Sequence, residues 1–315
     1  MSPNLIEDMG SMDDAGVYAI NNDIALVQSV DFFFPIVNNP RDFGRIVAAN
    51  SLSDIWAMGA KPLTAMNILA YPAGQIPEEA IEELLIGGSE KLTEAGVALV
   101  GGHTLEQETF VYGMSVTGTV HPDALKTNGT ARVGDTLILT KPIGSGVMAG
   151  AVEKDGLNEG EYKNFVESMY RLNKYAAEAL LRFDVSALTD ITGFGLLGHA
   201  LPFARNADVD LHFNLESIPF YKGVFDFMDT YFPQGICKTS EYVEDYTCKD
   251  THADEKKVKL LSAAQTSGGL LAAIRPDQAK TALEQLHAAG DTDSAIIGEV
   301  YARNRKSGTC CLFVH

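Results

Sequence analysis

The sequence predicts a mixed protein of two domains, of either the α+β or the α/β class. Its 315 residues are about twice the length of a common domain. Segments with strand patterns and segments with helix patterns follow each other in mixed order along the whole chain. A polar, turn-rich stretch at 121–134 separates two such series, so we expect an N-terminal domain over 1–128 and a C-terminal domain over 129–315.

The first half opens with strand patterns and continues into an amphipathic helix. Asn39 is a good N-cap, and Pro40 suits the first helical position because its missing N–H is not needed there. Gly96 marks the end of a second helix that Pro77 opens. In order, we expect strands at 17–20 and 24–34, a helix at 40–58, a strand at 63–71, a helix at 77–96, and strands at 98–101 and 109–120.

The second half alternates strands and helices over similar lengths. The stretch 220–255 is aromatic and polar without a clear period, so we predict no element there. In order, we expect a strand at 135–140, a glycine turn at 144–146, a helix, a strand at 185–191, a helix, a strand at 209–213, a strand at 269–274, a helix at 276–289, and strands at 295–301 and 309–314.

Composition narrows the functional classes. The formal net charge of −18 disfavours a nucleic-acid surface, which needs a basic patch. No apolar run reaches the roughly 18 residues of a membrane helix, and the N-terminus lacks a secretory pattern, so we expect a cytoplasmic protein without membrane or nucleic-acid partners. None of the four cysteines forms a C-x-x-C pair; we expect neither a zinc site nor a disulfide framework, and we expect Cys310 and Cys311 to be buried thiols.

Four aspartates in segments of small residues are the candidate chemistry: Asp14, Asp31, Asp54 and Asp190. Carboxylates at strand ends, beside glycine, can hold hard cations around a polyphosphate. Asn50 and Asp54 are four residues apart on the expected helix and therefore share one face, which could form part of a site. The same spacing is also typical of an ordinary helix face exposed to solvent. Asp31 interrupts an apolar strand, where a buried carboxylate needs a partner or a metal.

Three glycine segments offer further candidates. Gly101–Thr104 is expected to end a strand and to present N–H groups to phosphate, although a lone His103 is more typical of a structural histidine. Gly193, Gly195 and Gly198 form a literal G-x-G-x-x-G, but the preceding Asp190 would repel a pyrophosphate unless metal intervened, which disfavours a dinucleotide site. Residues 265–269 read as a structural turn, and no P-loop motif occurs.

Six short segments occur in a characteristic order along the chain: Asp-Asp-Ala-x-Val-Tyr, Asp-Phe-Phe-x-Pro-Ile-Val, Asp-Phe-Gly-Arg-Ile, Gly-Gly-His, Thr-Asp-x-Thr-Gly-Phe-Gly-Leu-Leu-Gly-His and Gln-Thr-Ser-Gly-Gly-Leu-Leu. Together they resemble the selenophosphate synthetase (selenide, water dikinase) family. This family belongs to the aminoimidazole ribonucleotide synthetase-like superfamily. The resemblance implies two α+β domains and a homodimer whose N-terminal sheets pair into a barrel. It also implies the reaction of ATP, selenide and water to selenophosphate, AMP and phosphate.

The resemblance also assigns site residues. All of them lie in the N-terminal domain, which would bind ATP and form the dimer, except Asp190, which lies in the C-terminal domain. Asp14, Asp54 and Asp190 would bind Mg²⁺, and a monovalent cation is the second cofactor considered. The ATP site would be lined by Ser11, Met12, Asp13, Asp31, Asn50, Asp54, Gly102, His103 and Thr104.

The chain departs from the family pattern in three places. The 13 residues before Asp14 contain neither the reactive Cys or selenocysteine nor the catalytic Lys that the family carries there, so no catalytic residue is assigned in this chain. We hypothesise a start site upstream of an in-frame UGA codon. Ala263-Ala264 replaces Asp-Pro, and the 233–240 segment also differs.

Two alternatives stay open. One is another ATP-using enzyme of the superfamily, either a small-molecule kinase or an ATP-dependent ligase or cyclase. The other is a non-catalytic homodimer that binds ATP.

Overall fold

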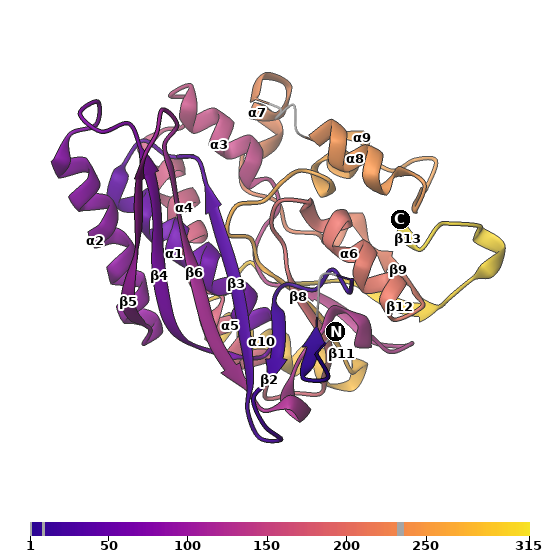
Figure 1. The fold of residues 1–315 in the computed structure, drawn as a ribbon. Helices are drawn as coiled ribbons and strands as arrows, with labels where there is room; N and C mark the ends of the chain where they lie inside the picture. The colour runs from indigo at the N-terminus through magenta and orange to yellow at the C-terminus, as the bar shows by residue number, and fades with distance from the viewer. Residues whose placement is uncertain (1, 8–9, 232–235) are drawn as a thin grey trace. The chain divides into compact units, whose positions relative to one another are not determined.

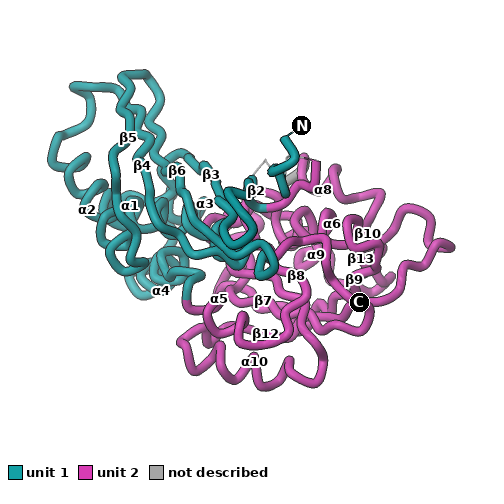
Figure 2. Tube along the Cα trace, turned by 60° about the horizontal axis from the view of Figure 1, so that its bottom comes forward, with its two compact units in different colours: residues 1–9, 14–125, 149–174 teal, residues 10–13, 126–148, 175–315 magenta. Residues whose placement is uncertain are grey.

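The structure, a computed structural model, describes residues 2–7, 10–231 and 236–315. These residues form two compact units (Figure 2). Unit 1 contains 2–7, 14–125 and 149–174, and unit 2 contains 10–13, 126–148, 175–231 and 236–315. Each unit joins a sheet of mixed strand direction to helices, which confirms the α+β class with two domains. The boundary at 128/129 stays a prediction.

Unit 1 is built on a six-stranded sheet in the order β1-β2-β3-β6-β4-β5 (Figure 1). Neighbouring strands are antiparallel except β4 and β5, which run parallel. The strands are β1 (Leu5–Glu7), β2 (Gly16–Ala19), β3 (Ala25–Phe33), β4 (Lys61–Tyr71), β5 (Ala98–Glu106) and β6 (Val111–Val120).

Helices α1 (Pro40–Ala57) and α2 (Glu78–Ala95) lie against one face of this sheet (Figure 1). Asn39 caps α1 as predicted, because its side chain accepts a hydrogen bond from the Asp42 N–H. The two helices approach very closely: a Cβ on Gly44 would meet the Leu84 carbonyl oxygen at 2.0 Å. Helices α3 (Ser145–Glu153) and α4 (Glu159–Tyr170) follow later in the chain, and α4 packs on α1.

The opposite face of the unit 1 sheet, here called the open face, carries exposed apolar side chains. Strand alternation sends Tyr112 and Met114 into the helix-covered core, where both are fully buried. Residues at the alternate positions of these strands point the other way; Phe32, which pairs with Gly113, is 57% exposed. The open face includes Val30, Phe32, Met66 and Leu105.

Unit 2 is built on a seven-stranded sheet in the order β10-β13-β9-β12-β7-β11-β8. Its strands are β7 (Thr136–Leu139), β8 (Val185–Asp190), β9 (Val209–Phe213), β10 (Thr247–Lys249), β11 (Leu270–Ile274), β12 (Ala295–Ala302) and β13 (Leu312–Val314). Its helices are α5 (Lys174–Leu180), α6 (Gly195–Asn206), α7 (Val224–Tyr231), α8 (Ile236–Glu244), α9 (Glu255–Leu261) and α10 (Pro276–Ala288).

The structure corrects two expectations about secondary structure. The 220–255 stretch holds α7, α8 and β10. Its helices have only 8 and 9 residues, so tertiary packing rather than a long period stabilises them. A single helix was expected between 146 and 185, where the structure has α3, α4 and α5. Part of the 233–240 departure, 233–235, lies outside the described residues.

The expectation of no disulfide was wrong, because Cys248 and Cys310 are bonded with their Cα atoms 5.9 Å apart. Strand β10 pairs in parallel with β13, which places Cys248 opposite Phe313 and close to Cys310. The two cysteines are 62 residues apart, so sequence spacing carries no sign of this pairing. Cys311 is a buried free thiol, as expected.

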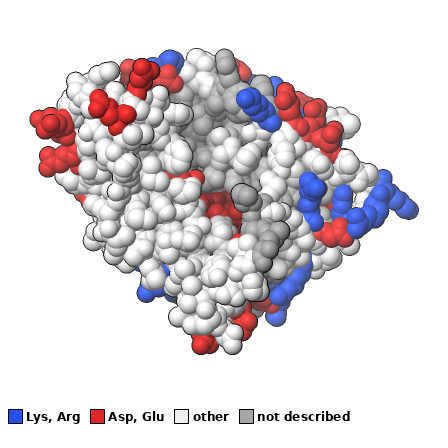
Figure 3. Space-filling view, viewed as in Figure 1, with Lys and Arg blue, Asp and Glu red and all other residues white. Residues whose placement is uncertain are grey.

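Charge is unevenly distributed over the face shown in Figure 3. Basic side chains gather at its right-hand edge, over the loop between β12 and β13, and acidic ones gather at the upper left over α2 and at the upper right. Among the described helices, none combines the length and apolar character needed to cross a membrane.

Candidate functional site

Strand β3 and helix α1 bring together three of the predicted residues of unit 1. The Asn50 Nδ2 donates to Asp31 Oδ2 at 2.9 Å, and the Ser29 hydroxyl donates to the Asp54 carboxylate. Asn50 and Asp54 are 5% and 8% exposed, so the alternative of a solvated polar face is wrong. Carboxylates and an amide thus converge where β3 meets α1, as the four-residue spacing predicts.

Burial changes the acidity of one of these carboxylates. Burial raises the pKa of Asp31 to about 6, and the hydrogen bond from Asn50 offsets only part of this effect. Asp31 therefore titrates near pH 6, about two pH units above an ordinary aspartate. A bound cation nearby would favour its charged form.

The glycine segment around His103 is placed differently from the prediction. Gly101–Thr104 does not end a strand; it lies in the middle of β5, which continues to Glu106. A Cβ on Gly102 would meet the Asn67 carbonyl oxygen at 2.3 Å, so close strand contact explains this glycine. Three strand steps separate β5 from β3, roughly 14 Å, so one chain does not bring Gly102 and Thr104 to Asp31.

The segment Ser11–Asp13 is fastened within unit 2 by two asparagines. The Asn128 amide donates to the Met12 carbonyl oxygen at 3.0 Å, and its backbone N–H donates to the Asp13 carboxylate. The Asn206 amide donates to the Ser11 carbonyl oxygen at 2.6 Å. The sequence analysis did not identify either asparagine as a site residue. Asn128 lies in the polar stretch that was interpreted as a domain boundary, but the residue itself is only 2% exposed.

Asp190 is the last residue of β8 and is 1% exposed. Just after it, the Thr192 N–H donates to His199 Nε2 at 3.1 Å. Burial lowers the pKa of His199 to about 4, so the imidazole is neutral at neutral pH and can accept this bond. His199 thus shapes the turn that follows Asp190. It was not among the predicted site residues, although it closes the Gly-Phe-Gly-Leu-Leu-Gly-His motif.

The topology rules out the dinucleotide interpretation of this motif. Strand β8 is an edge strand and runs antiparallel to β11, whereas a dinucleotide fingerprint needs a parallel βαβ unit. Gly195 has φ +69°, and a Cβ on it would meet the Ala263 carbonyl oxygen at 2.6 Å. This glycine therefore serves a tight turn and close packing.

Comparison with known proteins assigns the family. A model of AIR synthase related proteins matches in two parts, its N-terminal domain at 12–120 and its C-terminal domain at 132–311. A protein of Caldanaerobacter subterraneus named "Selenide, water dikinase" is 42% identical over 94% of this chain and 86% of its own length. A protein of Trichlorobacter lovleyi with the same name is 44% identical over 96% of this chain and 87% of its own length. The chain belongs to the selenide, water dikinase family.

Solved structures show the same fold at low identity. AaThiL complexed with AMPPCP and TMP has a TM-score of 0.70 at 16% identity, covering 96% of this chain and 87% of that one. Hydrogenase maturation protein HypE in complex with ATP has a TM-score of 0.69 at 20% identity, covering 96% and 82%. Both support the two-domain α+β fold of the family.

The family turn at 265–269 is structural, as its residues predicted. The Gln265 Oε1 accepts bonds from the N–H groups of Gly144 and Ser145, at 2.9 and 3.0 Å. The buried Lys141 ammonium donates to the Ser267 carbonyl oxygen at 3.0 Å. Ala263, where the family usually has Asp, is fully buried; its small apolar side chain avoids the cost of burying a carboxylate.

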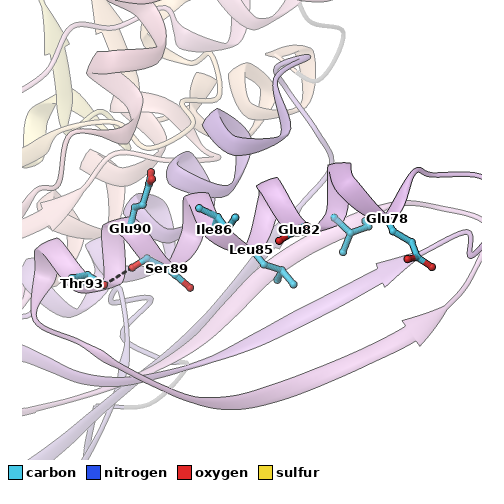
Figure 4. A pocket seen from close by; sticks show the side chains of 8 residues that line it. Glu78, Glu82, Leu85, Ile86, Ser89, Glu90 and Thr93 are labelled. Carbon is cyan, nitrogen blue, oxygen red and sulfur yellow. Dashed lines mark hydrogen bonds between the residues drawn. The ribbon is translucent and has the colours of Figure 1, made fainter.

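A groove of about 810 Å³ in unit 1 is lined by residues of α2 (Figure 4). It contains none of the predicted ATP or metal residues. Its lining mixes carboxylates with apolar side chains: Glu78, Ile81, Glu82, Leu85, Ile86, Ser89, Glu90 and Thr93.

Proposed function

We propose that this chain makes selenophosphate from selenide, in the reaction of ATP, selenide and water to selenophosphate, AMP and phosphate. The observation that carries the proposal is the identity of 42% and 44% to relatives named selenide, water dikinase, over nearly the whole chain. We expect the reaction to take place in the cytoplasm.

Three carboxylates are the proposed Mg²⁺ ligands: Asp14, Asp54 and Asp190. Their oxygens suit a hard cation, and the burial of Asp54 and Asp190 fits groups that act on a bound ion rather than on solvent. When bound, Mg²⁺ would neutralise charge on the polyphosphate, and we propose a monovalent cation as an additional cofactor. The protein's part is to hold these carboxylates in place, as Ser29 does for Asp54.

Within each unit, hydrogen bonds hold residues of the proposed ATP site in place. Asp31 and Asn50 offer an acceptor and a donor side by side, and Asn128 fixes the backbone of the 11–13 segment. Such positioning is most of what phosphoryl transfer asks of a protein. The full proposed set is Ser11, Met12, Asp13, Asp31, Asn50, Asp54, Gly102, His103 and Thr104.

We also propose that two copies pair through the open face of the unit 1 sheet, forming a barrel across a homodimer. Exposed Phe32 and its apolar neighbours on that face support this pairing. Strand β5 is an edge strand exposed along its whole length, so a second copy would also enclose its Gly102–Thr104 segment.

The nucleotide product tests the proposal. The full-length gene product is incubated with Mg-ATP, with and without selenide, and nucleotides are separated chromatographically. We expect AMP in proportion to selenide consumed. A small-molecule kinase would instead form ADP without needing selenide, and a non-catalytic dimer would bind ATP and return it unchanged.

A further inference from the structure

A pair of histidines lies on the unit 2 sheet, apart from every residue assigned above. His212 of β9 and His315, which follows β13, face each other with His212 Nδ1 and His315 Nε2 2.8 Å apart. Strands β9, β12 and β13 lie side by side here (Figure 1). We call His212 and His315 the histidine pair.

The sheet holds the backbone of both histidines in place. In β9, His212 pairs with Phe313 of β13 on one side and with Glu299 of β12 on the other. The His315 N–H donates to the Phe213 carbonyl oxygen at 3.0 Å, and its own carbonyl accepts from the Leu215 N–H at 2.9 Å. The imidazoles therefore project from fixed points on one sheet.

Aromatic packing also fixes the orientation of the two rings. Phe313 stacks on His212 with centroids 4.5 Å apart and on His315 with interplanar angle 9°. Tyr301 lies against His212 from the other side, with centroids 4.4 Å apart. The two imidazole planes differ by only 19°, with their centroids 5.0 Å apart, and the 2.8 Å separation of His212 Nδ1 and His315 Nε2 brings one nitrogen of each ring together.

The hydrogen bonds favour a lone pair on His315 Nε2, the nitrogen that faces His212. Asp250 Oδ1 lies 3.4 Å from His315 Nδ1, which favours the proton on that nitrogen and the lone pair on Nε2. The proton between the rings then belongs to His212 Nδ1. If the His212 imidazole changes tautomer, so that its proton moves from Nδ1 to Nε2, a lone pair is exposed on Nδ1. The lone pairs of His212 Nδ1 and His315 Nε2 then face a common point, and no proton is released to solvent.

We propose that the histidine pair binds one borderline divalent transition-metal ion, such as Zn²⁺, Ni²⁺ or Cu²⁺, through His212 Nδ1 and His315 Nε2. Imidazole nitrogens suit these ions, whereas Mg²⁺ prefers oxygen. Two nitrogens on a tetrahedral Zn²⁺ lie roughly 3.3 Å apart, so the rings need to separate by only about half an ångström. Water completes the coordination, with Glu299 on the adjacent strand adding negative charge.

Zinc titration of the full chain tests the site. Calorimetry uses ZnCl₂ with excess Mg²⁺ present, so that oxygen sites are already occupied. We expect His212→Gln and His315→Gln each to remove one zinc site per chain, and Asp250→Asn to weaken it about ten-fold, because carboxylates behind a ligating histidine tune its affinity. Circular dichroism and thermal unfolding check that each variant is folded.

Two controls separate this site from others. His121→Gln removes an exposed histidine that lies 3.9 Å from the carboxylates of Asp23 and Asp123, so it tests a histidine beside acids without a second imidazole. Asp190→Asn tests the proposed Mg²⁺ site. Both should keep the zinc site. Unchanged zinc binding in folded His212→Gln and His315→Gln proteins would overturn the proposal and leave the pair a structural hydrogen bond.

Discussion

Asp31 links ionisation to stability in unit 1. Its pKa of about 6 in the folded protein exceeds the ordinary value of about 3.9 expected in the unfolded chain. Well below pH 4 both states are protonated and the group has no effect on stability. As pH rises from about 4 to 6 the unfolded state ionises first, so the folded state loses stability, by at most about 3 kcal/mol once pH exceeds 6.

We therefore predict that Asp31→Asn stabilises the ligand-free protein by about 1–3 kcal/mol at pH 8 and has little effect at pH 4. The neutral amide can still accept the bond from Asn50. Urea unfolding without Mg²⁺ or nucleotide measures the difference, and exposed Asp23→Asn serves as the control. A gain of equal size at both pH values would contradict the shifted pKa.

Asp190 carries the metal assignment in unit 2. Asp190→Asn should abolish Mg²⁺-dependent ATP binding and leave the fold intact, because it removes charge with almost no change in volume. This loss should exceed the roughly 10–100-fold expected for a group behind the ligands. Calorimetry with Mg-ATP measures affinity, thermal unfolding checks the fold, and Asp208→Asn, which is exposed, is the control. An unchanged ATP affinity would exclude Asp190 as a ligand.

At the scale of elements, the contact between α1 and α2 depends on glycine. A Cβ on Gly44 would meet backbone atoms of Leu84, which cannot move without separating the helices. We predict that Gly44→Ala lowers the free energy of unfolding by about 1–3 kcal/mol, the usual cost of overpacking. Gly160→Ala, at an exposed position of α4, should be neutral or slightly stabilising. Chemical denaturation compares the two, and equal effects would show that the close approach does not matter.

Elements with a long period or a clear cap could be predicted from the sequence. Helix α1 begins at Pro40 as expected, and α2 ends before Gly96, whose φ of +76° confirms a left-handed cap. The short α7 and α8 could not be predicted, because packing and not periodicity stabilises them. The Gly102 segment reads as a turn locally, but strand pairing with β4 holds it inside β5.

In the candidate site, too, some contacts could be predicted from local sequence and others could not. The juxtaposition of Asn50 and Asp54 with β3 follows from helix spacing and from the polar residues Ser29 and Asp31 of that strand. By contrast, the amide of Asn128 meets the Met12 carbonyl across 116 positions of sequence. The Cys248–Cys310 bond likewise depends on which strands become neighbours. Long-range pairing of this kind has no local signal.

At the scale of the whole molecule, the open face should determine the oligomeric state. We predict that Phe32→Glu converts a homodimer of twice the 33.9 kDa chain into a monomer, because it places a charge in each buried sheet interface. Val133→Glu, at a 60% exposed apolar position of unit 2, should leave the dimer intact. Sedimentation equilibrium measures the mass of each protein. A Phe32→Glu protein that stays dimeric would mean that the copies pair through another surface.

Phosphorus NMR of the full-length gene product with Mg-ATP and ⁷⁷Se-enriched selenide tests the central claim most directly. The proposed function predicts a new ³¹P resonance split by bonded ⁷⁷Se, appearing together with AMP and inorganic phosphate and absent in the Asp190→Asn protein. ATP consumption that yields ADP, or phosphate without a selenium-coupled resonance, would contradict selenophosphate synthesis.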